Sequence, residues 1–249
     1  MMTQISPSES SNEVKTIKQI CLQLSKKGIK FYSDSKNPVV STYAFVEKHT
    51  FDEFEFKNED LCIGISLDIL KSCFKYIRRN DGLTITLTKS EYKPFPDKIK
   101  FSINDSKGFS IKCTPVQNID LEEYENFKYI ANIPTSKFSN LYKEIGGVKK
   151  KVYIEEVNLN LVMSCNMVDI AEKWISFPLD ENSSHFENKT VVRSEHFKVA
   201  SKISAFDSNV KLFVDNLGNI LLKTEIKKEN LVIGYVHVCI NNELCIDVK

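Results

Sequence analysis

Apolar and polar residues alternate along many short segments of this chain, and this period of two is typical of strands with one buried face. In the first half, strands are expected at 20–25, 28–33, 39–46, 51–56, 61–65, 83–88, 98–103 and 109–113. In the second half, they are expected at 129–133, 151–156, 159–165, 170–177, 190–193, 210–214, 220–226 and 231–240. Runs of strands with few helices between them predict an α+β fold of antiparallel sheets.

Helical periodicity occurs at three places, each directly after an expected strand. Ser66, Thr135 and Ser194 are of the residue types that cap helix N-termini. The apolar residues that follow recur at helical spacing and predict three buried helix sides: Leu70, Cys73, Phe74 and Ile77; Phe138, Leu141, Tyr142 and Ile145; Phe197, Ala200 and Ile203. Basic residues fall away from these sides: Lys71, Lys75, Arg78, Arg79, Lys137, Lys143, Lys198 and Lys202.

The N-terminal segment allows two interpretations. Residues 1–12 are polar and rich in serine, and a short helix from Asn12 to Gln19 would place Lys15 and Lys18 on its outer face. A Lys-Lys-Gly turn then predicts a hairpin of 20–25 with 28–33. The alternative is one longer helix from Glu13 to Lys26.

A unit of strand, helix, turn and strand occurs three times, at 65–87, 133–155 and 192–214. Such a repeat indicates like-folded parts. The acidic segment 114–128 lacks a clear period and is interpreted as a connector, with an amphipathic helix as the alternative. We therefore expect an N-terminal domain at 1–113, a connector at 114–128 and a C-terminal domain at 129–249.

Composition adds two constraints. The net charge is only +1, so any binding to nucleic acid depends on how the charges are arranged. The seven cysteines are odd in number and form no C-x-x-C pair, which favours free thiols in a reducing, intracellular compartment. Neither a signal peptide nor a membrane-spanning run is recognisable. We expect no metal and no cofactor.

The sequence does not predict an enzyme. It contains no phosphate-binding loop, no dinucleotide-binding glycine motif, no nucleophile elbow and no zinc-protease motif. Its carboxylates fall on polar strand faces or in loops, where they solvate the surface. Cys73 and Cys165 lie in apolar runs, which raise the pKa of a thiol and disfavour it as a nucleophile.

Lysines on one exposed helix face usually serve solubility alone. Three helices of like design change this interpretation, because symmetry-related basic faces would point to one common place. A surface of lysine and arginine without base-specific partners suits sequence-independent contact with a phosphate backbone.

Four segments resemble the sliding clamps of the proliferating-cell-nuclear-antigen (PCNA) type. They are GIKFYSDSKNPVVSTYAFVEKHTFDEFEF (28–56), LCIGISLDILKSCFKYIRRNDGLTITL (61–87), YIANIPTSKFSNLYKEIGGVKKKVYIE (129–155) and VVRSEHFKVASKISAFDSNVKLFVDNLGNILLKTEI (191–226). The resemblance implies two similar clamp-type domains per chain and a ring-shaped trimer whose basic helices line the hole. It implies a non-catalytic ring that encircles double-stranded DNA and acts as a processivity factor for a DNA polymerase, with a clamp loader as a further partner.

The resemblance also implies roles for individual residues. The basic helix residues named above, together with Lys15 and Lys18, would face DNA. Val39, Ile119, Leu121 and Tyr235 would border a pocket for partner peptides beside the connector. Strand 109–113 of one chain would pair with strand 174–179 of the next, with Phe109, Ile111, Cys113, Trp174, Ile175 and Phe177 at the subunit interface.

The chain departs from the usual clamp pattern at both ends. Its N-terminal segment is short, and its C-terminal residues CINNELCIDVK lack the usual proline–lysine tail. These departures indicate a divergent clamp and suit a viral source, and we expect it to act in the nucleus or at a site of viral DNA replication. The alternatives are a subunit of a mixed, checkpoint-type ring and a clamp-like viral transcription or replication factor that closes no homotrimer.

Overall fold

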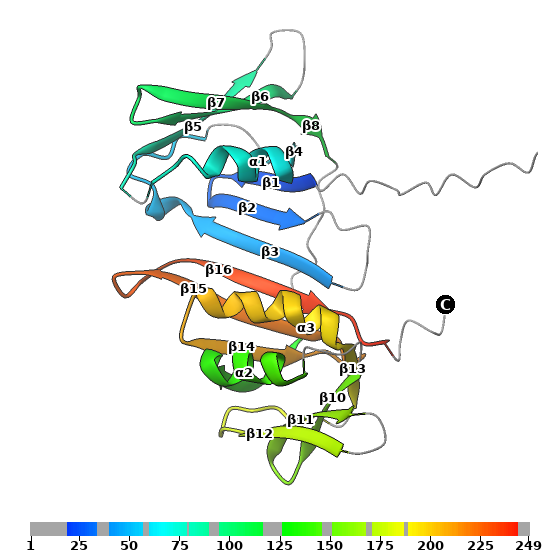
Figure 1. The fold of residues 1–249 in the computed structure, drawn as a ribbon. Coiled ribbons are helices and arrows are strands. Elements are labelled where there is room, and N and C mark those ends of the chain that lie inside the picture. Colours follow the sequence, from blue (N-terminus) through cyan, green and yellow to red (C-terminus); the bar gives the residue numbers. More distant parts are fainter. Residues whose placement is uncertain are drawn as a thin grey trace, which may run out of the picture.

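The computed structural model describes residues 19–33, 40–56, 60–78, 80–89, 95–116, 126–145, 151–167, 171–186 and 189–243. Three complete copies of one unit follow each other there, each a strand and a helix followed by a meander of three antiparallel strands (Figure 1). The first copy is β4 (Leu61–Ser66), α1 (Leu67–Phe74), β5 (Leu83–Lys89), β6 (Pro96–Ile103) and β7 (Lys107–Lys112). The second is β9 (Lys128–Pro134), α2 (Thr135–Ile145), β10 (Lys151–Val157), β11 (Asn160–Met167) and β12 (Ala171–Pro178). The third is β13 (Thr190–Arg193), α3 (Ser194–Ser201) with the 3-10 turn η2 (Lys202–Ala205), β14 (Asn209–Val214), β15 (Ile220–Lys228) and β16 (Leu231–Ile240).

Ahead of these copies stands a meander without a described strand or helix before it. It consists of β1 (Gln19–Ser25), β2 (Gly28–Ser33) and β3 (Val40–Glu47), followed by the 3-10 turn η1 (Lys48–Thr50). The hairpin of β1 and β2 was predicted and is confirmed. The alternative helix from Glu13 to Lys26 is wrong, because 19–25 pair with both β2 and β4 as a strand.

The second half of the chain is tied together by a reciprocal exchange of strands, and one pairing of this kind is described in the first half. In the second half, β9 pairs with β14 of the following unit, while β13 pairs with β10 of the preceding one. In the first half, β4 likewise pairs with β1. The short strand β8 (Thr114–Pro115), at the start of the expected connector, pairs with β4 and extends the sheet of the first half.

The two halves share one continuous sheet. β3 of the first half and β16 of the second pair antiparallel, from Val40 opposite Ile240 to Val46 opposite Gly234. The nine strands therefore run in the order β8-β4-β1-β2-β3-β16-β15-β14-β9, flanked by the sheets β5-β6-β7 and β12-β11-β10-β13. All described pairs of neighbouring strands are antiparallel, which confirms the α+β prediction.

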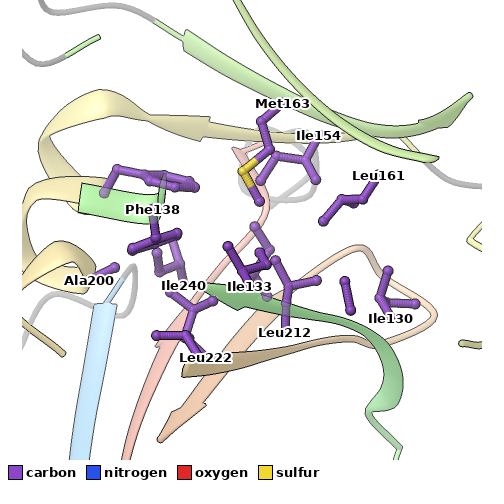
Figure 2. Packing of buried hydrophobic residues seen from close by; sticks show 14 of the residues in the cluster. Ile130, Ile133, Phe138, Ile154, Leu161, Met163, Ala200, Leu212, Leu222 and Ile240 are labelled. Atoms are coloured by element: carbon purple, nitrogen blue, oxygen red, sulfur yellow. The ribbon is translucent and has the colours of Figure 1, made fainter. Parts of the chain in front are cut away.

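Alternating apolar side chains of the sheets and one side of each helix form two cores. The second-half core contains Ile133 of β9, Leu212 of β14 and Phe138 of α2 (Figure 2). Val40 and Ala44 of β3 pack onto this core from the first half, so the junction between the halves is apolar as well as hydrogen-bonded. The first-half core holds Leu22, Leu24, Ile29, Ile63, Ile65, Leu70, Ile99, Phe101, Ile111 and Cys113.

One expected strand is absent. Residues 51–56 alternate like a strand, yet they form bends and irregular backbone after η1. The three phenylalanines there all pack against the first-half core, and the rings of Phe51 and Phe54 lie 5.3 Å apart between centroids. Their burial anchors a loop, so the alternation reflects anchoring without strand pairing.

Candidate nucleic-acid interface

Helix α1 presents its basic residues to solvent. The hydroxyl of Ser66 accepts a hydrogen bond from the backbone N–H of Ile69, as the expected N-cap does. Leu70 is buried, whereas Lys71 and Lys75 are exposed. The prediction that Ile77 belongs to the buried side of this helix is wrong, because the helix ends at Phe74. Ile77 follows in a loop and is only partly buried.

The loop after α1 is fixed by one carboxylate. Asp81 accepts the backbone N–H of Arg78 at 2.8 Å and the amide of Asn104 at 2.9 Å. The hydrogen bond from the Arg78 backbone, helped by Asn104, lowers the pKa of Asp81. The loop is thereby tied to the turn between β6 and β7, while the Arg78 side chain remains exposed next to α1.

Helices α2 and α3 pack against each other through aromatic rings. The fully buried rings of Phe138 and Phe197 lie 5.4 Å apart between centroids. Thr135 begins α2, and both its hydroxyl and its backbone N–H donate to the carbonyl oxygen of Ser208, which ties the helix start to the β14 side. Lys137 and Lys143 of α2 are exposed, as is Lys202 at the start of η2.

The three helices lie on one face of the nine-stranded sheet, the side turned to the viewer in Figure 1. The side chains of Lys71, Lys75, Arg78, Lys137, Lys143 and Lys202 make no ion pair with any described residue. Several lysines on the strands do: Lys211 pairs with Glu225, and Lys227 pairs with both Asp207 and Glu225. The helix face therefore carries positive charge that the described part of the chain does not neutralise.

The side chains of four expected DNA-facing residues are not described by the structure. Lys15, Lys18 and Arg79 are outside the described residues, and of Lys198 only the backbone position in α3 is described. The six residues above therefore lie on α1 or directly after it, on α2, and at the start of η2, which follows α3.

Two of the edge strands in the described sheets lie at opposite ends of the molecule and are the last strands of their meanders. β7 ends the sheet β5-β6-β7 and β12 ends the sheet β12-β11-β10-β13, and each is the last strand of its meander. Figure 1 shows these two sheets at the upper and lower ends of the molecule. β3 and β16, which join the halves, are also last strands of their meanders.

The expected interface residues divide into two groups. Ile111, Cys113 and Phe177 are buried in the cores of their own chain. Phe109 and Ile175 are partly buried at the edges, and Phe109 stacks on Phe101 with ring centroids 4.8 Å apart. Trp174 stands out, since 67% of its surface is exposed on β12.

Of the expected peptide pocket, only Tyr235 is described; Val39, Ile119 and Leu121 fall outside the described residues. Tyr235 lies on the sheet face opposite the core, and the Lys223 ammonium sits 4.8 Å from the centre of its ring. Burial, with Lys211 nearby, lowers the pKa of Lys223. Beside it, a polar cavity of about 220 Å³ is lined by residues that include Asn132, Lys211, Lys223 and Glu225.

The described residues lack two features that mark other classes of protein. No group of three or more histidine, cysteine, aspartate or glutamate side chains among them is arranged to hold a metal ion. No helix among them has the length and apolar character needed to cross a membrane.

The architecture is that of the PCNA-type DNA sliding clamps. The structure superposes on the crystal structure of the PCNA2–PCNA3 complex from Sulfolobus tokodaii with a TM-score of 0.69, over 91% of each chain and at 18% identity. Within this class, the chain belongs to the family of the repair proteins Rad1/Rec1/Rad17, whose model matches residues 10–216. It is also 32% identical over 226 residues to uncharacterized protein 436R of Invertebrate iridescent virus 6, covering 85% of this chain and 74% of that protein.

The clamp fold expected from the sequence is therefore confirmed. The family match is to repair proteins and does not name a polymerase processivity factor. The assignment rests on the family and on the fold. The descriptions of the matching family and of the matching structure name no enzymatic activity.

Proposed function

We propose that this chain is a non-catalytic subunit of a ring-shaped clamp that encircles duplex DNA and serves as a sliding platform for repair or replication proteins. The observation that carries the proposal is the face shared by the three helices: six exposed basic side chains on or directly after α1, on α2 and at the start of η2 form no ion pair with a described carboxylate. The family match to repair proteins supports the same conclusion.

The chemistry of this face suits a ring that slides. Lysine and arginine attract phosphates without reading base sequence, and such contacts weaken steeply as salt rises. None of the six side chains forms an ion pair with a described carboxylate, and Arg78 and Asp81 attract each other only at longer range. Retention on DNA would then come from enclosure, with weak phosphate contacts keeping the duplex centred.

The ring would close by the same kind of joint that joins the two halves. β3 and β16 show that last strands of two meanders pair edge to edge in this fold. β7 and β12 are the corresponding last strands that lack an outer partner among the described residues. Because they lie at opposite ends, successive chains would join head to tail, and such contacts form a ring when the rotation from chain to chain closes.

The side chains at the two edges are complementary. On the core side, Phe109 of one chain would meet Ile175 of the next and continue the apolar layer beneath the sheet. On the outer side, β7 offers the small residues Gly108 and Ser110. The exposed indole of Trp174 would lie over them. This complementarity supports a ring of identical chains, three by the clamp resemblance.

The second candidate is a mixed ring, in which β7 or β12 pairs with a different clamp chain. The match to the repair proteins Rad1/Rec1/Rad17 favours it. Either ring would act where DNA is replicated or repaired, in the nucleus or at a site of viral DNA replication, with DNA polymerase and a clamp loader among its partners.

Threading onto DNA with removable end blocks tests enclosure. The chain is incubated with a linear duplex biotinylated at both ends, streptavidin is added to block the ends, and salt is raised. We expect the chain to stay on the DNA only when both ends are blocked. Cutting the blocked duplex with a restriction enzyme should then release it. Equal release from blocked and open DNA would refute the proposed function.

Charge removal tests the helix face. Replacing Lys71, Lys75 and Lys137 by alanine should lower the salt dependence of binding to short duplexes, by about 0.9 in the logarithmic slope for each lost contact. A matched variant replaces the exposed turn lysines Lys26, Lys27 and Lys48 and should leave the slope unchanged. An equal effect of both variants would contradict the assignment of the helix face.

Measured mass separates the two rings. A particle near three times the chain mass of 28.6 kDa from the purified chain supports the homotypic ring. A monomer that assembles only with another clamp chain supports the mixed ring. A chain that stays monomeric both alone and with other clamp chains, and that fails the threading assay in both cases, rejects both rings.

A further inference from the structure

The sheet β5-β6-β7 has a second surface, opposite the first-half core. Alternation along each strand decides which residues lie there: Ile85, Ile99, Phe101 and Ile111 turn to the core, so their neighbours in sequence turn outward. The outward set consists of nine positions, which we call the outer plate: Thr84, Thr86 and Thr88 on β5, Lys98, Lys100 and Ser102 on β6, and Gly108, Ser110 and Lys112 on β7.

The outer plate holds only lysine, hydroxyl residues and glycine. Eight of its nine positions are exposed, and Ser102 is partly so. No position carries a carboxylate or an apolar side chain larger than the methyl group of threonine. Lys98, Lys100 and Lys112 form no ion pair with a described residue, although the chain as a whole has nearly as many acidic residues as basic ones.

The register brings the three lysines together. Lys98 lies directly opposite Lys112, and Lys100 is two residues further along β6, opposite Ser110. Neighbouring strands are about 4.8 Å apart, and residues i and i+2 of a strand are about 6.7 Å apart. Like charges at these distances repel, so the plate gains stability when an anion lies across it.

The residue types favour a phosphate backbone over a protein surface. Protein interfaces depend on buried aromatic, leucine-like or arginine anchors, and the plate offers none. Backbone contacts to nucleic acid use lysine and hydroxyl groups, which make up nearly the whole plate. The plate carries no aromatic side chain of its own on which an unpaired base would stack, which favours duplex over single-stranded nucleic acid. In a closed ring, Trp174 of the next chain would lie over Gly108 and Ser110 at the β7 edge, and Lys98 and Lys100 of β6 would stay open.

We propose that the outer plate binds the sugar–phosphate backbone of duplex DNA, at a site separate from the helix face. The plate and α1 lie on opposite sides of the first-half core, so one straight duplex cannot contact both at once. The ligand would therefore be a second DNA segment, or a part of the same molecule that bends back outside the ring. This inference extends the proposed function but does not depend on ring closure.

The test uses the full-length chain in which Lys71, Lys75 and Lys137 are already alanine, so that helix-face binding is weakened. Binding of a short, fluorescently labelled linear duplex is followed by anisotropy at several salt concentrations. Adding Lys98→Ala, Lys100→Ala and Lys112→Ala is expected to lower the remaining affinity at least tenfold at low salt. It should also reduce the logarithmic salt slope by about 0.9 per lysine removed.

Lys26→Ala, Lys27→Ala and Lys48→Ala in the same background form the matched control, and melting temperatures verify that each variant remains folded. An unchanged affinity after removal of the plate lysines, or the same loss in the control, would overturn the proposal. So would a single-stranded oligonucleotide or polyglutamate that competes as well as the duplex at equal charge. The plate variant alone should still pass the threading assay, so failure of the plate and failure of the clamp give different results.

Discussion

The single tryptophan of the chain provides a direct test of ring closure. Trp174 lies on the edge strand β12 with 67% of its surface exposed, so Trp174→Glu leaves its own core intact. The free energy of unfolding of the isolated chain should change by less than about 0.5 kcal/mol. In a closed ring, however, the same change puts a charge against the edge of the next chain.

The magnitude follows from the exposed area. A tryptophan buries at most about 250 Å². With 67% exposed, about 165 Å² of Trp174 remains for a neighbour. At about 25 cal/mol per Å² this gives an upper limit of about 4 kcal/mol for each joint, before the costs of association. Even half of that value weakens each joint about 30-fold.

Two measurements check this prediction. Light scattering should show Trp174→Glu as single chains at concentrations where the unmodified chain forms rings. Tryptophan emission of the unmodified chain should shift to longer wavelength on dilution, as the indole returns to water. Leu217→Glu, at a 62% exposed turn position between β14 and β15, is the matched control and should still assemble. Assembly of Trp174→Glu like the unmodified chain would refute the reasoning.

Three further predictions concern the fold. Phe138→Ala should lower the free energy of unfolding by about 3–5 kcal/mol, because its ring is fully buried; a denaturant titration showing less than about 1 kcal/mol would contradict this packing. Gly234→Ala should cost about 1–3 kcal/mol, because the new Cβ would lie 2.0 Å from the carbonyl oxygen of Phe45; an unchanged melting temperature would contradict the β3–β16 register. Because the Arg78 backbone lowers the pKa of Asp81, the stability advantage over Asp81→Asn should be present above the ordinary value of 3.8. That advantage should be lost as pH falls through the lowered pKa of Asp81 in the folded chain. If the unmodified chain still had a higher urea midpoint than Asp81→Asn at about pH 2, the hydrogen bond would be contradicted.

Strands and helices of this chain follow from local patterns. The hairpin of β1 and β2 and the cap at Ser66 rest on interactions between residues close in sequence, so the sequence alone predicts them. Residues 51–56 show the limit of that approach. Their phenylalanines alternate because they reach into the first-half core from a loop, and no local signal distinguishes an anchored loop from a strand.

The functional surfaces depend on contacts that the sequence does not reveal. The basic helix residues were predictable, because helical spacing separates them from the apolar stripe. The burial of Ile111 and Phe177 in their own cores was not, because it depends on which sheet lies beneath them. Lys98, Lys100 and Lys112 of the outer plate were missed, although alternation within the expected strands 98–103 and 109–113 places them on one face once their pairing is known.

The pairing of β3 with β16 makes the two halves of this chain resemble two separate proteins that dock. Strand pairing and the apolar contacts of Val40 and Ala44 hold the junction, while the polypeptide link between the halves runs elsewhere in sequence, between β8 and β9. A protease cut in that link would leave a non-covalent pair of fragments, and the halves could be expressed as two genes and recombined. Such a chain can be read as a fused dimer, whose halves remain exchangeable parts in evolution and in protein engineering.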